Sequence, residues 1–544
     1  MEGIRFTATS VSDRLPAGRS LFTSTGDGRH FCWWEWEEEP EVRGRFAWDG
    51  LPGRRFDGLQ RQHSGELVVW SPRSHVGFYG MRGNRGFVAV DDTESEPFEV
   101  LTRSVPLTFS PDDRHFAYGR YVGDAPRLFV DHRLTGDYGL APCAPLFSPD
   151  GRRLAVVATD HQPVKGHDAG DARQWVVLDG EPLPAHSAIG VVSPKPPRDI
   201  VPDMDFSPDS RRFAYVGVEA QADGRRLCRL WADGVLGDPL AWVELGRFSL
   251  DSRRLCWVEA VDGRHRRLVV DGTPGRDYGA LPTETVQFSP DGRHLACAAQ
   301  LESGSWIAVL DGEEGPPFSG LTAGVFSPDS RHLAYVGRRP RPGLLGRLHP
   351  EELLVVDGEI VAAVDEASAP PAFSPDGRHV AVAGRLGKTW HLFVDGQAGP
   401  GLAGLDTPVY SAAGRLAALQ AAGPEGGFRL WVDGAQGPTV EETSALVVDG
   451  VPRPFAFTPD GQHTVMVGRL GDRWHPIVDD QVGPGFEWLG APVMRPGGEI
   501  VFWAYSGPGV TRIEALLPTA APGAARIAAP AAEEPQPVLV DLPR

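Results

Sequence analysis

The phrase Phe-Ser-Pro-Asp-Gly-Arg recurs along this chain and constrains its fold more than any other feature. Complete copies span residues 147–152, 288–293 and 373–378. Near-copies begin at Phe109, Phe206, Phe248, Phe326 and Phe457. A short apolar run follows each copy, and a second turn sequence, Val-Asp-Gly or Leu-Asp-Gly, comes after that run in most units. A repeat of roughly 40 residues with two such turns predicts four short antiparallel strands, as in one blade of a propeller.

Residues 284–322 illustrate how one unit is expected to fold. The first strand ends at Phe288, and Ser289-Pro-Asp-Gly292 turns the chain, because Pro fixes φ and Gly accepts the left-handed conformation. Residues 293–299 return as the second strand, and residues 306–310 form the third. Residues 315–321 are short and rich in glycine and polar groups, which is typical of an outer edge strand.

Weaker copies near both ends bring the chain to about twelve such units of roughly 40 residues. We therefore expect an all-β fold with four-stranded blades, arranged as two six-bladed propellers. The predicted divisions are 1–275, with residues 1–12 as a closing strand, 276–517, and an Ala/Pro-rich tail over 518–544 that we expect to be largely disordered. No linker marks the boundary near residues 273–287, so one closed ring and a seven-plus-five split are alternatives.

The Phe-Ser-Pro-Asp-Gly-Arg hairpin with its apolar return strand resembles the Pro-Asp repeats of the TolB-like, WD-repeat-like β-propeller superfamily. The resemblance covers roughly Leu21 to Leu516. It implies a propeller fold, and the superfamily includes periplasmic interaction propellers and the gating propellers of prolyl oligopeptidase-like and tricorn-like proteases. This chain has no Gly-x-Ser-x-Gly elbow, and residues 1–19 have no apolar core of the length that a signal peptide needs. We therefore expect no inherited peptidase activity and a cytoplasmic location.

The net charge, the apolar runs and the cysteines of the chain limit the classes of partner and the environments that we expect for it. The formal net charge of −19 argues against nucleic-acid binding, which needs a basic surface. No run of about 18 apolar residues is present, so we expect no membrane span. The five cysteines fall in apolar repeat positions and are expected to be buried and reduced. The bias toward Arg, Ala, Gly and Pro is typical of a GC-rich bacterial genome.

Motifs that resemble catalytic or ligand sites have simpler explanations. Residues 384–389 suggest a phosphate loop, but Val382 stands where the first glycine is required. Histidines such as His294 recur in one slot after the hairpin, where we expect a solvated residue at the start of a strand. The Asp of each Val-Asp-Gly is expected to hydrogen-bond its own turn. We predict no catalytic, cofactor or metal site, and whether the chain is an enzyme is uncertain.

Three segments break the repeat and connect strand ends on one face: 159–174, 186–205 and 337–352. Insertions on one face are where repeat proteins usually bind their ligands. The candidate binding residues in these segments are His161, His167, Asp168, Asp171, Lys195, Arg338, Arg339 and Arg341. The first four are a conceivable metal set without rigid spacing. The three arginines suit an acidic partner or belong to a solvated loop.

A tryptophan-rich stretch in the first unit supplies two further candidates. Trp34 and Trp36 stand beside several glutamates, which suggests an interaction surface or two rings packed beneath an acidic rim. We therefore expect a non-catalytic protein–protein interaction scaffold whose partner is another protein of unknown identity. The alternatives are a small-molecule or glycan sensor and an enzyme with its site at the channel mouth.

Overall fold

The computed structural model of this chain consists almost entirely of short antiparallel strands. It describes residues 4–12, 21–24, 31–37, 43–48, 51–56, 58–60, 68–72, 75–91, 93–99, 105–122, 125–136, 138–141, 143–160, 173–192, 200–201, 203–342, 348–368, 370–422, 426–448, 451–495, 498–506 and 509–517. The predicted tail, residues 518–544, lies outside them.

The strands group into successive sheets. The first six sheets contain β2 (Leu21–Ser24), β3 (Phe31–Glu37), β4 (Arg43–Trp48) and β5 (Leu51–Phe56); β6 (Gly58–Gln60), β7 (Val68–Trp70), β8 (Val76–Arg82), β9 (Arg85–Val90), β10 (Thr93–Glu94) and β11 (Phe98–Glu99); β12 (Val105–Phe109), β13 (Phe116–Val122), β14 (Ala125–Val130) and β15 (Arg133–Leu134); β16 (Gly139–Leu140), β17 (Leu146–Phe147), β18 (Leu154–Thr159), β19 (Gln174–Leu178) and β20 (Glu181–His186); β21 (Ala188–Ile189), β24 (Met204–Phe206), β25 (Phe213–Ala220), β26 (Arg226–Ala232) and β27 (Val235–Leu236); and β28 (Val243–Phe248), β29 (Leu255–Ala260), β30 (Arg266–Val270) and β31 (Thr273–Tyr278).

The later sheets follow a short 3-10 helix, η1 (Thr283–Thr285). They contain β32 (Gln287–Phe288), β33 (Leu295–Gln300), β34 (Trp306–Leu310) and β35 (Glu313–Glu314); β36 (Gly320–Leu321), β37 (Val325–Phe326), β38 (Leu333–Pro342), β39 (Leu348–Val356) and β40 (Glu359–Val364); β41 (Glu366–Ala367), β42 (Ala372–Phe373), β43 (Val380–Leu386), β44 (Thr389–Val394) and β45 (Gln397–Ala398); β46 (Val409–Tyr410), β47 (Leu416–Ala421), β48 (Phe428–Val432) and β49 (Ala435–Gln436); β50 (Glu442–Thr443), β53 (Phe455–Phe457), β54 (Thr464–Leu470), β55 (Arg473–Val478) and β56 (Gln481–Val482); and β57 (Trp488–Leu489), β58 (Val493–Met494), β59 (Glu499–Ser506), β60 (Gly509–Leu516) and β1 (Arg5–Ser12). Two small hairpins, β22 (Val191–Val192) with β23 (Ile200–Val201) and β51 (Leu446–Val448) with β52 (Val451–Arg453), complete the set.

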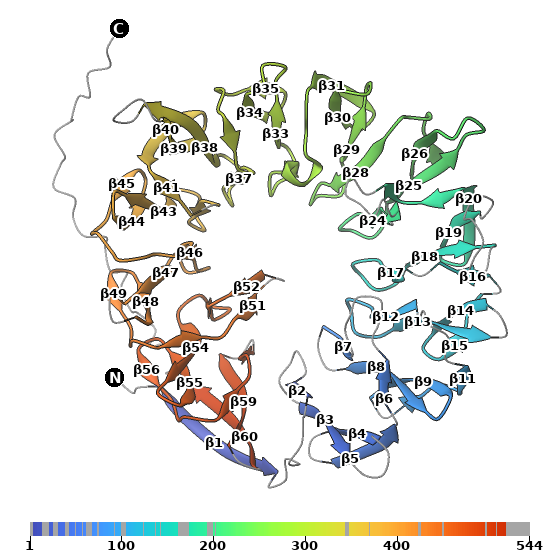
Figure 1. Cartoon of the computed structure of the whole chain (residues 1–544), viewed down its shortest axis with the longest axis horizontal. Coiled ribbons are helices and arrows are strands. Elements are labelled where there is room, and N and C mark those ends of the chain that lie inside the picture. Colours follow the sequence, from blue (N-terminus) through green and yellow to red (C-terminus); the bar gives the residue numbers. More distant parts are fainter. Residues whose placement is uncertain are drawn as a thin grey trace.

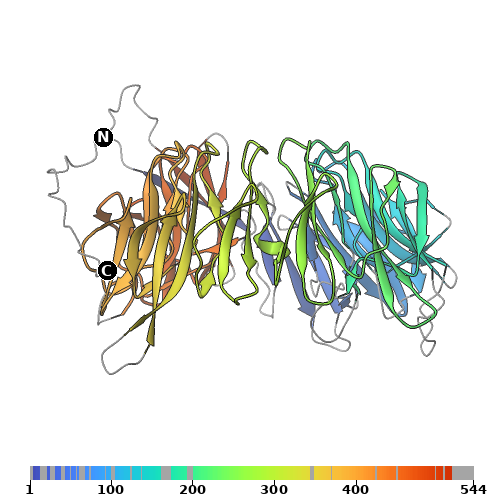
Figure 2. The same ribbon diagram turned by 90° about the horizontal axis from the view of Figure 1, so that it is seen from above.

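The sheets follow one another around a single ring, which is flat when seen from the side (Figures 1 and 2). Apolar clusters fill the space between successive sheets, so the central strands are buried on both faces. The sheet β28–β31 packs against β25 and β26 on one side and against β33 and β34 on the other. It has no face left to close a six-bladed ring with the first sheet. This arrangement corresponds to the single-ring alternative, and the cluster containing Tyr278 and Leu295 spans the predicted boundary.

Scattering in solution tests whether the chain forms one ring or the predicted units 1–275 and 276–517. A single ring is expected to give a small-angle scattering envelope with one disc and a central opening. Two lobes of similar size would instead support the division into two propellers. The measurement needs only the purified full chain.

The repeated hairpin turn is stabilised by its own side chains. In the turn at Ser289, the Ser289 hydroxyl donates to Asp291 Oδ1 at 2.6 Å and accepts the His294 N–H at 2.9 Å. Gly292 has a φ of 72°, in the left-handed region. In some other turns a serine takes the place of this glycine. One of them is Ser330 in the next sheet, and its hydroxyl accepts a hydrogen bond of 3.0 Å from the N–H of Asp291. The turns therefore connect neighbouring sheets as well as neighbouring strands.

Gly292 is expected to tolerate serine better than alanine. A Cβ at this position meets the Asp251 carboxylate at 2.7 Å, and the positive φ adds strain, so Gly292→Ala should cost about 1–2 kcal/mol. Gly292→Ser carries the same Cβ but gains the hydroxyl acceptor that the equivalent serines provide. Urea unfolding should show a smaller loss for the serine variant, with Gly263→Ala, in open space, as control. Equal losses for Ser and Ala would contradict the role of the hydroxyl.

The N-terminal strand completes the last sheet. β1 pairs with β60 in antiparallel register from Arg5 opposite Leu516 to Ser12 opposite Val510. In Figure 1, the blue β1 lies beside the red β60. This is the pairing expected from the sequence, where the last unit lacks a fourth strand and the first residues have no repeat of their own.

The described cysteines are all free thiols. Cys228, Cys256 and Cys297 are buried, and burial raises the pKa of Cys297 to about 12 and that of Cys256 to about 11. These thiols therefore stay protonated and unreactive at neutral pH and serve as small apolar side chains.

Candidate functional site

The histidines of the repeat slot are not merely solvated, contrary to the sequence-based expectation. His294 Nδ1 lies 2.7 Å from Oδ2 of Asp311, the Asp of the next Leu-Asp-Gly turn. Oδ1 of Asp311 accepts the Leu295 N–H at 2.9 Å, and Asp311 has a φ of 53°. The same arrangement recurs in the pairs His75–Asp91, His115–Asp131, His332–Asp357, His379–Asp395 and His463–Asp479.

These contacts also correct the role of the Asp residues. Their carboxylates do not close their own turns, because they accept hydrogen bonds from the first residues of the second strand. Each Asp therefore clamps the third strand to the second at the hairpin-turn face. The repeated His and Asp residues are structural, and equivalent pairs belong to separate sheets.

Where arginine replaces histidine in this slot, the contact reaches the next sheet. Arg212 Nε lies 2.7 Å from Asp233 Oδ2, and Nη1 donates to the carbonyl of Arg253 at 2.7 Å. Its guanidinium also lies over the Phe248 ring, at 5.1 Å from the ring centroid. Arg153 and Arg254 make similar inter-sheet contacts.

Replacing Arg212 should therefore cost more stability than replacing His294. Arg212→Ala removes an ion pair, hydrogen bonds to two carbonyls and a ring contact, for an expected loss of about 1–3 kcal/mol. His294→Ala removes one partly exposed contact, for about 0.5–1 kcal/mol. Urea unfolding at neutral pH compares the two. Losses of the same size would show that the bonds to the next sheet contribute little.

Several predicted binding residues lie outside the described residues: His161, His167, Asp168, Asp171 and Lys195. Trp34 and Trp36 lie on β3, but their side chains are not among those described. Within the described parts of the chain, no group of three or more His, Cys, Asp or Glu side chains is placed to hold a metal ion.

The third inserted segment differs from its expected form as a loop. β38 and β39 continue through it as a paired hairpin, with Arg338 opposite Glu352 and Pro342 opposite Leu348. Arg338 Nε lies 2.6 Å from Glu352 Oε1, and Arg339 Nε lies 2.8 Å from Glu351 Oε2. Opposite charges that face each other across two strands favour an ordered hairpin. Arg341 lies opposite His349 in this register.

A polar cluster that the sequence analysis missed lies between the fourth and fifth sheets. His186, at the end of β20, has a side chain that is 1% exposed, and burial lowers its pKa. Nε2 lies 3.3 Å from the Tyr215 hydroxyl, and Nδ1 lies 3.9 Å from Glu219 Oε1. Glu219 in turn pairs with Arg229 at 3.0 Å. Two other outer strands of six residues end in an aromatic side chain, Phe56 or Tyr278, at the position where β20 ends in His186. A histidine at an aromatic position was therefore the feature of the sequence that could have indicated this cluster.

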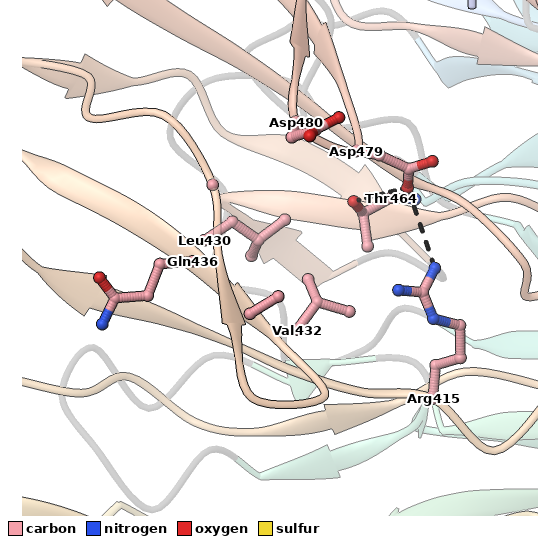
Figure 3. Close-up of a pocket in the computed structure, with 9 residues that line it drawn as sticks. Arg415, Leu430, Val432, Gln436, Thr464, Asp479 and Asp480 are labelled. Atoms are coloured by element: carbon pink, nitrogen blue, oxygen red, sulfur yellow. Dashed lines mark hydrogen bonds and ion pairs between the residues drawn. The ribbon is translucent and has the colours of Figure 1, made fainter. Parts of the chain in front are cut away.

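Clefts open between neighbouring sheets in the described part of the chain, and two of them have well-defined linings. One, of about 260 Å³, is lined by Arg415, Val432, Gln436, Thr464 and Asp479 (Figure 3). Arg415 already pairs with Asp433 at 2.8 Å, and Thr464 donates to Asp479 at 3.3 Å. These polar side chains of the cleft therefore already have partners within the protein.

The second cleft, of about 340 Å³, lies between β26 and β30. Arg267 and Glu259 form an ion pair of 2.6 Å at its wall, and Trp257 Nε1 donates to Glu259 at 3.0 Å. Leu230 and Val269 supply apolar surface.

No family model matches the chain, and no curated protein matches it. Several solved structures are similar to it. A eukaryotic initiation factor is 11% identical with a TM-score of 0.32, and the match covers 68% of this chain and 94% of that one. The propeller domain of the trilobed protease from Pyrococcus furiosus is 12% identical with a TM-score of 0.25, covering 50% and 91%. TolB from Acinetobacter baumannii is 13% identical with a TM-score of 0.22, covering 55% and 79%.

The arrangement of antiparallel sheets around one axis decides the architecture (Figure 1). The chain is a β-propeller. Among the described residues, no helix is long and apolar enough to cross a membrane.

Proposed function

We propose that this propeller is a non-catalytic protein–protein interaction scaffold that binds another protein on the face from which the β38–β39 hairpin projects. The observation that carries the proposal is the length of that hairpin. β38 has 10 residues and β39 has 9, whereas β33 and β34 of the preceding sheet have 6 and 5. The hairpin therefore reaches beyond its neighbours (Figure 2).

Ion pairs and a hydrogen bond hold the base of this hairpin in place. The Glu352 and Glu351 side chains are 10% and 12% exposed, while their partners Arg338 and Arg339 are 58% and 52% exposed. Glu352 Oε2 also accepts the Ala367 N–H of the next sheet at 2.7 Å. A rigid support that presents half-exposed guanidinium groups is well suited to selective recognition.

Prolines shape how the hairpin can be recognised. Pro340 lies opposite Pro350 in the register, and Pro342 follows on the same strand. Proline lacks the backbone N–H, so these positions discourage the addition of another strand along the hairpin. Recognition is therefore expected to use side chains.

The proposal is tested by shortening the hairpin. Residues 339–351 are replaced by Asn-Gly, a two-residue turn that keeps the Arg338–Glu352 pair. Proteins captured by the wild-type and shortened chains from cells of the native host are compared by quantitative mass spectrometry. We expect at least about a tenfold loss of the specific partner, equivalent to about 1.4 kcal/mol.

The matched control is Lys388→Ser, in the β43–β44 turn of the next sheet. This substitution removes a positive charge from the turn that corresponds to the tip of the β38–β39 hairpin, and it leaves the hairpin itself unchanged. The amount of partner captured should therefore stay the same. A shortened chain that folds and still captures the same proteins in the same amounts would overturn the assignment of the binding face.

A further inference from the structure

Exposed arginines form a row along the hairpin-turn face. In seven successive sheets, from β12–β15 to β41–β45, the residue that follows the Ser-Pro-Asp-Gly turn or its variant is an exposed arginine. These sheets lie side by side around the ring (Figure 1). The members of this arginine row are Arg114, Arg152, Arg211, Arg253, Arg293, Arg331 and Arg378.

Neighbouring turns contact one another, so the arginine row has a continuous support. The N–H of Asp150 donates to the Ser210 hydroxyl of the next sheet at 3.0 Å, and the N–H of Asp209 donates to the Ser252 hydroxyl at 2.9 Å. Sheets that pack face to face are about 10 Å apart, and an extended chain advances about 3.3 Å per residue. Residues about three positions apart in an extended peptide therefore match the spacing of successive arginines.

The guanidinium groups of the arginine row are held only loosely by their own turns. Nε of Arg253 lies 3.9 Å from Oδ2 of Asp251, which is beyond hydrogen-bond distance. Oδ1 of Asp251 accepts the Ser249 hydroxyl at 2.6 Å and the backbone N–H of Arg253 at 3.2 Å. The Arg253 side chain is 86% exposed and that of Asp251 is 34% exposed, so the guanidinium reaches further into solvent than the carboxylate.

The carboxylates of this face are balanced at the middle of the arginine row. In three consecutive sheets a second arginine follows the first, at positions 152–153, 211–212 and 253–254. The second arginine pairs with the Asp of the following turn, as Arg212 does with Asp233 at 2.7 Å. It is also less exposed, since the side chain of Arg254 is 31% exposed. The first arginine of each doublet therefore remains the group that an approaching molecule meets.

The middle turn of the arginine row carries an apolar side chain. Leu250 stands where the turns of the other six sheets have proline, and it is 64% exposed. Proline fixes φ at this position and restricts the unfolded chain, so leucine gives up a stabilising residue and exposes aliphatic surface. Binding surfaces combine an apolar contact at their centre with polar and charged groups around it. Leu250 and its flanking arginines have this arrangement.

We propose that the arginine row, with Leu250 at its centre, binds an extended acidic segment of a protein that places carboxylates on the guanidinium groups and one apolar side chain on Leu250. The planar donors of arginine match a carboxylate. The net charge of −19 repels a long nucleic acid more strongly than a short segment with few carboxylates. The arginine row lies at the opposite ends of the strands from the β38–β39 hairpin, so this inference is independent of the proposed function.

Fluorescence anisotropy of a labelled peptide with the full chain tests the proposal. The probe is Glu-Ser-Pro-Glu-Leu-Ser-Glu-Ser-Pro-Glu, for which we expect a dissociation constant of about 10–100 μM. The double substitution Arg211→Ser and Arg253→Ser should raise this constant at least about tenfold, because it removes two charged contacts. Leu250→Pro should raise it about threefold or more through the lost apolar contact. The fold accommodates this change, since proline stands there in the other turns.

Two controls separate the arginine row from general effects of charge. Arg225→Ser removes an arginine that is 78% exposed in the β25–β26 turn, at the opposite end of β25, and should leave the dissociation constant unchanged. A peptide with lysine in place of each glutamate should not bind. The proposal is overturned if the acidic peptide does not bind up to about 1 mM, or if its affinity survives both the double substitution and Leu250→Pro. A single-stranded DNA that binds more tightly than the peptide, with the same sensitivity to these substitutions, would assign the surface to nucleic acid instead.

Discussion

Removal of residues 1–12 is expected to lower the melting temperature by about 4 °C or more and to promote aggregation. The deletion takes away β1 and leaves β60 as an open edge in the last sheet. It also removes Ile4 and Phe6, which pack against the apolar cluster that includes Phe486 and Ile513. Differential scanning calorimetry of the truncated chain measures the first effect, and light scattering measures the second.

A pair of point substitutions separates packing from strand pairing. Phe6→Ala should lower the free energy of unfolding by about 2–3 kcal/mol, because the ring packs on the last cluster and against Gly483. Thr7→Ala, at an exposed position of the same strand, should change it by less than about 0.5 kcal/mol. If the truncated chain melts at the same temperature as the wild type, the last sheet must be stabilised by something other than β1.

Local features of the fold were predictable because their causes lie within a few residues. The Ser-Pro-Asp-Gly turn places its hydroxyl, carboxylate and left-handed residue within one hairpin, so repetition alone identified it. The pairing of β1 with β60 followed from one incomplete unit and one extra strand.

Contacts between distant residues were harder to predict. His294 and Asp311 are 17 positions apart and meet only because two strands align. The sequence did contain a signal for this contact. In many units a His or Arg after the hairpin turn occurs together with the Asp of the Val-Asp-Gly or Leu-Asp-Gly turn, and a basic and an acidic residue that recur together can form a pair. The hairpin at Arg338 was hidden by its prolines, although the facing pairs Arg338–Glu352 and Arg339–Glu351 are arranged symmetrically about its tip.

The protonation state of a buried carboxyl group depends on neighbours that belong to other strands, and a local sequence pattern does not reveal those neighbours. Asp203 shows this most clearly. Its pKa is raised to about 7, mainly by burial and in smaller part by the nearby carboxyl groups of Glu244 and Asp205, against a hydrogen bond of 2.8 Å from the Leu245 N–H, which lowers it. Burial likewise raises the pKa values of Asp205 and Glu244, while Arg247 opposes the rise at Asp205.

The sign of the resulting pH dependence is fixed by the direction of this shift. Because the pKa of Asp203 is higher in the folded chain than its ordinary value of 3.8, folding favours the protonated carboxyl. Its contribution to stability is complete below about pH 4 and is lost as the pH rises through about 7. The turn carboxylates have the opposite shift: the Ser289 hydroxyl lowers the pKa of Asp291, and this contribution is lost as the pH falls below about 4.

Asp203→Asn is therefore expected to raise the free energy of unfolding at pH 8 by about 2–4 kcal/mol relative to the wild type. The amide keeps an acceptor for the Leu245 N–H but cannot ionise, so the difference between the two chains should shrink as the pH falls from 8 to 4. Urea unfolding at pH 4, 6 and 8 measures it, with Asp277→Asn, on the exposed strand β31, as control. The loss of stability below about pH 4 should remain in both chains, because it belongs to the turn carboxylates. A variant that is no more stable than the wild type at pH 8 would show that Asp203 carries no cost of ionisation in the folded chain.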